Sequence, residues 1–428
     1  MHPRNMTLYS VFVRNHGGTF QAVARDVPRI RDLGVDAVWL LPIHPIGRQN
    51  RKGALGSPYA IADYRAVNPE YGTLEDFCAL CDTVHRHGMK LLIDVVYNHT
   101  SPDSRLLQEH PEWFYRRPDG AFGNRVGEWS DVVDLDFSKE ALWAELIDTL
   151  KQWARVVDGF RCDVAPLIPL SFWIRARQEV EAVRPGCLWL AESVEPAFVR
   201  DLRNRGMTCH SDAELYQTFD VSYDYDVYGD FLDYVRGKTT LDTYAAALER
   251  QESQYPASYV KLRFLENHDR PRMAHLFPDR LTRLNWLAWT FFQKGMTLLY
   301  GGQEWEVAHR PSLFDADPVP MDGPAPLCDF VRRLAHMKKD PLFSQGVYSF
   351  RACPGDLLLA RWEGEGRQAL GLFSLKGKAG VAQVPLEDIC LPNLLTGAPV
   401  RVESGLWATD GQPVILMTPS HAQEEKTC

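Results

Sequence analysis

Several features that would place the chain in a specialised class of protein are missing from its sequence. Met1–Ser10 lacks the apolar stretch of a secretory signal peptide, and no segment approaches the roughly 20 apolar residues of a transmembrane helix. The nine cysteines are scattered without a framework spacing, which is typical of free thiols in a reducing compartment. Lys and Arg form no long run. We therefore expect a cytoplasmic protein with neither a membrane nor a nucleic acid as partner, and no pattern indicates its oligomeric state.

The composition is that of an ordinary globular protein. Hydrophobic residues make up 45% of the 428 residues and charged residues 24%, with a formal net charge of −9. This length exceeds that of a usual single domain, which favours one large and one small domain. An acidic balance suits a neutral substrate better than a phosphate-rich one.

Apolar runs alternate with amphipathic helical patterns through the first three quarters of the chain. The predicted strands are Leu8–Val13, Val35–Leu41, Lys90–Val96, Asp158–Val164, Leu188–Ala191, Thr218–Val221, Val260–Leu265 and Thr297–Tyr300. Parallel strands need a long crossover between them, and helical patterns separate most of these runs. Eight strands in this order predict an α/β fold, the (β/α)8 TIM barrel.

Two further parts are predicted around the barrel. The segment 101–137, which follows the third strand, is too long for a simple connection and predicts a short lobe over the active site. Turn-separated strands without helices predict an antiparallel β-sandwich domain over 341–428. The barrel then comprises 1–100 and 138–340. Gln423–Cys428 are expected to be disordered.

Polar side chains gather where the predicted strands end, which is where a barrel of this kind has its active site. They are Asp94, Asn98, His99, Arg161, Asp163, Glu192, Asn267, His268 and Asp269. Arg161 and Asp163 are two residues apart, so they share one face of a strand. By itself this pair also fits a buried ion pair that only holds the fold. Carboxylates from three strands are costly to bury for stability alone, so the whole cluster indicates a function.

Glycosidic bond cleavage needs several carboxylates and no Ser or Cys nucleophile. One carboxylate attacks the sugar while a carboxylic acid protonates the leaving oxygen. Arg161 beside Asp163 favours the ionised form of that carboxylate, as a nucleophile requires. A metal-dependent hydrolase would need several histidine ligands, and the first strand offers only His16. Carbohydrate chemistry is therefore favoured.

Four ordered motifs make the prediction more specific. They are Asp94–His99 (DVVYNH), Gly159–Asp163 (GFRCD), Ala191–Glu192 (AE) and Phe264–Asp269 (FLENHD). Together they resemble the signature regions of the α-amylase family of glycoside hydrolases. Gly56–Tyr64 and Asn68–Gly72 are similar to the segment that follows the second strand in that family. The resemblance spans the whole barrel, and a C-terminal β-domain agrees with it.

The resemblance implies three catalytic residues. Asp163 is the nucleophile that forms a glycosyl-enzyme ester, Glu192 is general acid and then general base, and Asp269 stabilises the transition state. Burial near other carboxylates is expected to keep Glu192 protonated. A retaining enzyme of this kind has its nucleophile and acid about 5–5.5 Å apart.

The resemblance also implies a set of residues around the substrate. His99 and His268 bind the sugar, Tyr59 stacks beneath its ring, Arg161 orients Asp163, and Asp94 supports the set. The lobe adds four aromatic residues: Trp113, Phe114, Tyr115 and Trp129. They either stack on sugar rings or form the small core of the lobe itself.

Some positions depart from the family pattern. Pro166 and Leu167 stand where many starch-degrading members have a Lys-His pair, and Asn98 matches a calcium ligand whose partner is not evident. The loop Asn15–Gly18 lacks the Asp-rich run of some members. Calcium is left open by the resemblance, but we expect no obligatory calcium, no other metal and no cofactor. Small imported α-glucans are the expected substrates.

Three functions remain open at this stage. The first is a retaining α-glucan hydrolase. The second is a transglycosidase or phosphorylase with the same catalytic residues, for which Arg270 and Arg272 are either phosphate-binding cations or solvated loop charges. The third is a non-catalytic carbohydrate-binding relative, which predicts the loss of an acid, whereas all three acids are present. Linkage preference and exo or endo action do not follow from the sequence.

Overall fold

The computed structural model describes residues 1–127, 129–384 and 388–418, so the disorder predicted for Gln423–Cys428 lies outside the described residues. The chain forms two compact units. The N-terminal unit consists of Leu8–Asp226 and Arg310–Pro320, and the C-terminal unit of Met1–Thr7, Val227–His309 and Met321–Cys428.

Eight strands close into a barrel in the order β1-β10-β9-β8-β7-β6-β3-β2. They are β1 (Thr7–Val11), β2 (Ala37–Leu40), β3 (Lys90–Val95), β6 (Gly159–Cys162), β7 (Leu188–Ala191), β8 (Val221–Tyr223), β9 (Lys261–Arg263) and β10 (Met296–Tyr300). The pairings from β1 to β8 and between β9 and β10 are parallel. The predicted (β/α)8 barrel is confirmed.

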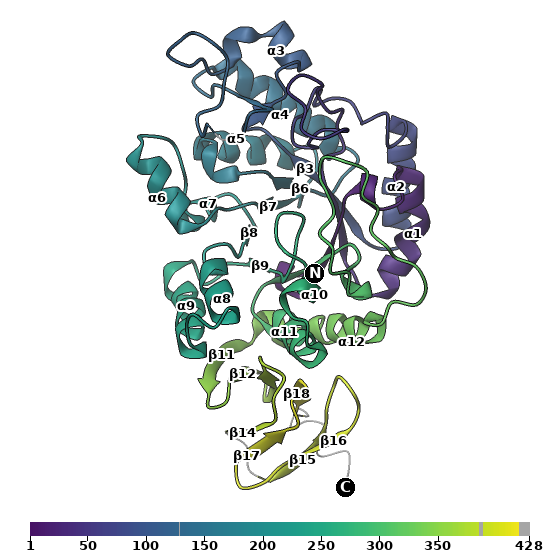
Figure 1. Ribbon diagram of the computed structural model, residues 1–428, viewed down its shortest axis with the longest axis vertical. Helices are drawn as coiled ribbons and strands as arrows, with labels where there is room; N and C mark the ends of the chain where they lie inside the picture. Colours follow the sequence, from purple (N-terminus) through teal and green to yellow (C-terminus); the bar gives the residue numbers. More distant parts are fainter. Residues whose placement is uncertain (128, 385–387, 419–428) are drawn as a thin grey trace. The chain divides into compact units, whose positions relative to one another are not determined.

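Helices accompany the strands in each unit, as Figure 1 shows. Those of the N-terminal unit are α1 (Phe20–Asp32), α2 (Leu74–Arg86), α3 (Arg105–Glu109), α4 (Glu140–Ala154), α5 (Leu170–Glu181), α6 (Pro196–Asn204) and α7 (Asp212–Leu215). Those of the C-terminal unit are α8 (Tyr228–Val235), α9 (Leu241–Gln254), α10 (Met273–Leu276), α11 (Arg280–Phe292), α12 (Cys328–Lys338) and α13 (Leu342–Gln345).

Local sequence sets both ends of α2, the helix that precedes β3. Thr73 and Asp76 form a capping box at its start, in which each side chain accepts the backbone N–H of the other. Gly88 follows the helix with φ of +70°, a left-handed conformation that favours glycine. The chain then enters β3, whose residues after Lys90 are all buried.

A glycine is required at the start of β6, where three strands approach closely. A Cβ atom on Gly159 would lie 2.5 Å from the carbonyl oxygen of Leu188 and 3.0 Å from the side chain of Leu92. Leu188 belongs to β7 and Leu92 to β3, the two neighbours of β6. The small residue therefore allows the strand that carries Arg161 and Asp163 to pack between its neighbours.

The sixth barrel strand lies three residues later than predicted. Thr218–Val221 was expected, whereas β8 begins at Val221 and ends at Tyr223. Thr218 and Phe219 instead donate their backbone N–H groups to Leu215 in the turn that follows α7. The shift matters because it places Tyr223, a residue absent from the predicted site, at the end of a barrel strand.

The lobe is attached to the end of β3 by a short antiparallel ladder. β4 (His99–Thr100) pairs with β5 (Val133–Asp134), with His99 opposite Asp134 and Thr100 opposite Val133. The backbone of Tyr115 adds a bond to the carbonyl oxygen of Asp134. The end of the lobe is therefore held next to a predicted sugar-binding histidine.

The C-terminal strands form the predicted antiparallel domain. They are β11 (Val347–Cys353), β12 (Leu357–Gly364), β13 (Arg367–Ser374), β14 (Gly380–Gln383), β15 (Ile389–Pro392), β16 (Pro399–Val402), β17 (Leu406–Thr409) and β18 (Val414–Met417). A four-stranded sheet, β11-β12-β13-β18, and the two-stranded sheets β14-β17 and β15-β16 enclose one apolar core. The other face of the larger sheet packs on α11, since the Trp362 indole donates to the carbonyl oxygen of Phe292.

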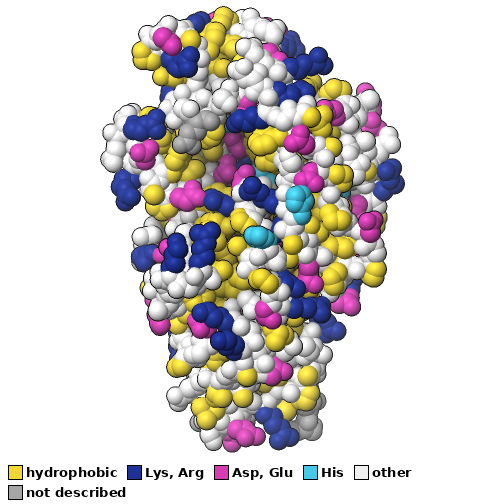
Figure 2. Space-filling view, in the orientation of Figure 1, with side chains coloured by type: hydrophobic (Ala, Val, Ile, Leu, Met, Phe, Trp, Pro, Cys, Tyr) yellow, Lys and Arg dark blue, Asp and Glu magenta, His cyan; other side chains and the backbone are white. Residues whose placement is uncertain are grey.

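Among the described residues, no helix has the length and apolar character needed to cross a membrane. Basic and acidic side chains are interspersed over the face of the molecule shown in Figure 2. The cysteines of the described part of the chain are all free thiols.

The core of the C-terminal sandwich predicts different effects for two neighbouring residues of β17. Trp407 is fully buried in this core, whereas Leu406 is 52% exposed. Replacing Trp407 by Ala should reduce the free energy of unfolding by about 3–5 kcal/mol because it leaves a large cavity. Leu406→Ala should change it by less than about 0.5 kcal/mol. Calorimetric unfolding of both variants tests this, and equal effects would contradict the packing described here.

Candidate active site

One arginine on β6 connects three acidic residues from three adjacent strands. The Nη1 atom of Arg161 donates to Asp94 Oδ1 at 2.7 Å and to Asp163 Oδ1 at 2.8 Å. Its Nη2 atom forms an ion pair with Glu192 Oε1 at 2.9 Å. Asp94 lies on β3 and directly opposite Arg161 in the ladder, and Glu192 follows β7. The structure therefore brings together four of the predicted site residues.

Burial and charge act in opposite directions on Arg161, whose side chain is fully buried. Burial by itself lowers the pKa of the guanidinium, but the negative charges of Asp94 and Glu192 outweigh it, and the pKa lies well above its ordinary value. Arg161 is therefore a permanent cation. A permanent cation favours the ionised form of the carboxylates that it contacts.

Three aromatic rings surround the same guanidinium. Its carbon lies 5.2 Å from the ring centre of Trp39, 5.7 Å from that of Tyr59 and 5.4 Å from that of Tyr223. The Nε atom of Arg161 also donates to the Tyr223 hydroxyl at 3.2 Å. Sequence analysis missed Tyr223; the available signal was its position at the end of the sixth strand, two residues beyond the predicted boundary.

Val164, directly after the predicted nucleophile, has an unusual backbone. Its φ is 35° and its ψ is 45°, a left-handed conformation that costs a β-branched residue free energy. This conformation directs the backbone N–H of Val164 to Glu192 Oε2 at 2.8 Å. The strained residue thus fixes the orientation of Glu192 relative to the neighbouring Asp163. No sequence motif identifies such a backbone donor.

The three carboxylates around Arg161 differ in their exposure to solvent. The side chains of Asp163 and Glu192 retain 8% and 9% exposure, whereas that of Asp94 is completely buried. Asp94 is therefore placed to hold Arg161, and the other two are placed to reach a substrate. The 5–5.5 Å separation of the two carboxyl groups and the proton on Glu192 remain predictions. The guanidinium of Arg161 and the backbone N–H of Val164, which both contact Glu192, suit an ionised carboxylate.

Tyr59 and His99 extend this group of residues toward the lobe. The Tyr59 hydroxyl donates to Asp94 Oδ2 at 3.3 Å, and a ring N–H of His99 donates to the backbone carbonyl of Tyr59. Asn98 Nδ2 lies 3.2 Å from Nδ1 of His99, which therefore accepts and leaves the proton on Nε2. Burial lowers the pKa of His99, so its imidazole is neutral near pH 7.

His268 and Asp269 belong to the C-terminal unit and follow β9. His268 Nε2 lies 3.0 Å from Asp269 Oδ2, and the backbone N–H of Asp269 donates to Asn267 Oδ1 at 2.9 Å. The His268 side chain is 1% exposed and that of Asp269 is 40% exposed. Asp269 therefore presents an oriented carboxylate to solvent. Its approach to Asp163 and Glu192, which lie in the N-terminal unit, remains a prediction.

The four aromatic residues of the lobe have different environments. Phe114 is buried against Phe122, and Tyr115 packs under the guanidinium of Arg125 at 4.4 Å. Trp113 stacks on the ring of His110 with centroids 3.7 Å apart. Trp129 lies 5.5 Å from the ring of His99. Phe114 and Tyr115 thus form the core of the lobe, and Trp129 is the aromatic residue placed beside a predicted sugar-binding residue.

The groups around Asn98 do not fit the calcium ion that the resemblance left open. Asn98 turns its Nδ2 donor toward Asp134 Oδ1 at 3.3 Å, and the guanidinium of Arg125 lies among the oxygen atoms of Asp134 and Leu135. A cation ligated by these oxygens would compete with that guanidinium. Within the described ranges, no three His, Cys, Asp or Glu side chains form a group that could hold a metal ion.

Comparison with known proteins identifies the family. The model of the α-amylase catalytic domain matches residues 11–318. The chain belongs to the α-amylase family. A second model, for the bacterial α-amylase C-terminal domain, matches residues 349–416 and includes most of the sandwich.

Two solved structures of this family resemble the chain over nearly its whole length. An alpha-amylase from Lactobacillus plantarum is 48% identical, with a TM-score of 0.95 over 97% of this chain and 99% of that one. A noncanonic maltogenic alpha-amylase from Thermotoga neapolitana is 34% identical, with a TM-score of 0.88 over 98% of this chain and 99% of that one.

Curated relatives match a shorter segment. The alpha-1,4-glucan:maltose-1-phosphate maltosyltransferase of Myxococcus xanthus is 36% identical over 228 residues, which is 47% of this chain and 34% of that protein. The corresponding enzyme of Cereibacter sphaeroides is 38% identical over 197 residues, or 41% and 29%. The matched segment thus spans about a third of the length of these relatives.

The central position of Arg161 predicts that a conservative replacement will fail. Arg161→Lys keeps a positive charge but offers one flexible ammonium group, which cannot replace the planar fork between three carboxylates. We expect kcat on a malto-oligosaccharide to fall about a hundredfold or more, with the secondary structure retained by circular dichroism. The control is Arg175→Lys, since Arg175 forms an exposed pair with Glu179 on α5. Wild-type activity in Arg161→Lys would refute the central role of this residue.

Proposed function

We propose that the chain is a retaining α-glycoside hydrolase that cleaves α-glucans or malto-oligosaccharides through a covalent glycosyl-enzyme intermediate. The observation that carries this proposal is the bonding of Asp163 and Glu192 to one buried cation, Arg161, on adjacent strands of an α-amylase-family barrel. A fixed cation keeps a nucleophilic carboxylate ionised and oriented.

The proposed reaction has two steps. Asp163 attacks the anomeric carbon and forms an ester with it, the glycosidic C–O bond breaks, and Glu192 gives its proton to the leaving oxygen. Glu192 then takes a proton from water, whose oxygen attacks the same carbon and releases Asp163. Asp269 is assigned to the oxocarbenium-like transition state, and the neutral His99 is assigned to contact with the sugar.

Transfer of the sugar to another acceptor is the alternative, because the maltosyltransferase relatives carry out such a reaction by name. Two observations favour hydrolysis. The alpha-amylase structures match almost the full chain, whereas the maltosyltransferases match a third of their own length. Of the two cations considered for phosphate, Arg272 is also engaged in a buried ion pair with Glu266.

Arg272 is not the solvated loop charge that was one of its two predicted roles. It is fully buried, donates to Glu266 Oε1 at 2.6 Å and lies 4.1 Å from the ring centre of Tyr300. The guanidinium carbon of Arg270 lies 4.6 Å from the ring centre of Tyr228. Arg272 thus stabilises the chain after β9, and binding of a substrate phosphate by it would require the loss of a buried ion pair.

The stereochemistry of the first product tests the proposal. Maltotetraose should yield shorter sugars whose new reducing end is first seen as the α-anomer by NMR. Asp163→Asn should lower kcat by about a thousandfold or more, because the nucleophile is lost. Asp148→Asn is the matched control, since Asp148 is an exposed residue of α4. A β-anomer as first product, or an active Asp163→Asn variant, would contradict the mechanism.

The same experiment distinguishes transfer from hydrolysis. Products longer than maltotetraose would indicate that another sugar is the preferred acceptor. A reaction that requires maltose 1-phosphate as donor, or inorganic phosphate as acceptor, would favour the alternative that the maltosyltransferase relatives suggest. Hydrolysis predicts that phosphate leaves the rate and the products unchanged.

A further inference from the structure

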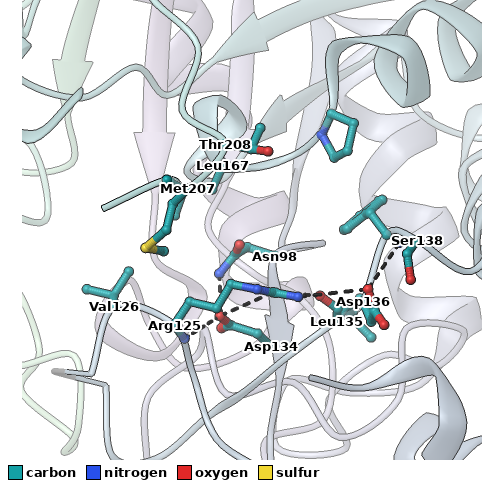
Figure 3. Close-up of a pocket in the computed structure, with 13 residues that line it drawn as sticks. Asn98, Arg125, Val126, Asp134, Leu135, Asp136, Ser138, Leu167, Met207 and Thr208 are labelled. Atoms are coloured by element: carbon teal, nitrogen blue, oxygen red, sulfur yellow. Dashed lines mark hydrogen bonds and ion pairs between the residues drawn. The ribbon is translucent and has the colours of Figure 1, made fainter. Parts of the chain in front are cut away.

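A cavity of about 370 Å³ in the N-terminal unit lies between the end of the lobe and the chain beyond the catalytic strand β6. Figure 3 shows Asp134, Asp136 and Arg125 on one side of it and Leu167, Met207 and Thr208 on the other. Arg125 extends its guanidinium along the acidic side. No role for this arginine follows from the catalytic cluster.

Arg125 is bound to the end of the lobe by its backbone and by its side chain. Its backbone N–H donates to Asp134 Oδ2 at 2.7 Å, and its Nη1 atom donates to the carbonyl oxygen of Leu135 at 3.0 Å. The same Nη1 lies 3.6 Å from Asp134 Oδ2, and Nη2 lies 3.9 Å from Asp136 Oδ1. Tyr115 covers one face of the guanidinium. The cation is therefore held in a fixed place between two carboxylates.

Asp134 is the residue that makes this cation necessary. Its side chain is 2% exposed, and burial raises its pKa above the ordinary value, against the opposing effects of the N–H and charge of Arg125. A buried carboxylate without a partner is costly, and pairing with a cation offsets that cost. The nearby Lys139 pairs with the more exposed Asp136, at 3.9 Å.

Asp134 in turn connects Arg125 with the substrate-binding residues. Its Oδ1 accepts from Nδ2 of Asn98, and the same Nδ2 contacts Nδ1 of His99. A ring N–H of His99 donates to the carbonyl oxygen of Tyr59, whose hydroxyl donates to Asp94 in the catalytic cluster. An ion pair and a series of hydrogen bonds thus connect the guanidinium of Arg125, through Asp134, Asn98, His99 and Tyr59, with the catalytic cluster.

We propose that Arg125 is a positioning residue, a cation built into the chain that holds Asp134 and through it orients Asn98 and His99, so that this part of the site needs no divalent metal. This follows from the presence of the guanidinium among the oxygen atoms that a metal would require. The effect on catalysis rests on the proposed function of His99, whereas the effect on the stability of the lobe does not.

Removal and replacement of the cation test the proposal. Arg125→Ala should lower kcat/KM for maltotetraose about tenfold and lower the Tm, because Asp134 loses its partner and Asn98 its fixed geometry. Guanidinium ion, well below denaturing concentration, should restore part of both in the variant, with sodium chloride at equal ionic strength as control. Arg125→Lys should lose less than Arg125→Ala, because a charge remains. Arg117→Ala, at an exposed residue of the same lobe, is the matched control.

Chelation provides a measurement that does not depend on activity. EDTA should leave the Tm of the wild type unchanged, and added calcium should raise the Tm of Arg125→Ala if it takes the place of the lost cation. The proposal would be overturned if EDTA lowered the Tm of the wild type and calcium restored it. It would also be overturned if Arg125→Ala had the same Tm and kcat/KM as Arg117→Ala. Equal losses of Tm and kcat/KM in Arg125→Ala and Arg125→Lys, with no response to guanidinium or calcium, would overturn it as well. If maltotetraose is not a substrate, the Tm measurements still decide this proposal while the proposed function fails.

Discussion

The candidate active site depends on one buried cation shared by carboxylates from three strands. Arg161 contacts Asp94, Asp163 and Glu192, and its fully buried side chain has no exposed surface through which water could replace them. Removing Arg161 would leave the carboxylates of Asp94, Asp163 and Glu192 without this shared cation in a site of low dielectric, which is strongly unfavourable. The same constraint orders the site, because a planar fork fixes the direction of each carboxylate that it binds.

Close packing and a strained backbone also position the residues around Arg161. Gly159 lets β6 fit between its neighbours, and Tyr223 binds the Nε side of the guanidinium. Val164 then holds a left-handed backbone that turns its N–H toward Glu192. Such strain persists only where the surrounding structure fixes it, and here it lies between the predicted nucleophile and the predicted acid. The arrangement orients Asp163 and Glu192, the two carboxylates predicted to be catalytic, by different means.

The lobe belongs to the same network of polar contacts. The ladder between β4 and β5 places Asp134 opposite His99, and Asn98 bridges the two side chains. A neutral His99 with its proton on Nε2 results from these contacts together with burial. Arg125 supplies the positive charge at the outer end of this chain of residues. The orientation of His99, which is predicted to bind the sugar, is thereby coupled to the folding of the lobe.

The sequence by itself determined the barrel, the C-terminal antiparallel domain and the strand ends at which the polar residues lie. Apolar periodicity marks buried strands and helices, and motifs such as Gly159–Asp163 place their polar residues at strand ends. The tertiary structure alone decided which groups hold those residues. Tyr223 is 62 positions from Arg161 in the sequence. Val164 orients Glu192 through its backbone conformation. Arg125 has no distinguishing sequence pattern, and its position depends on the ladder between β4 and β5. Periodicity reports burial along one element, whereas these contacts depend on how distant elements meet.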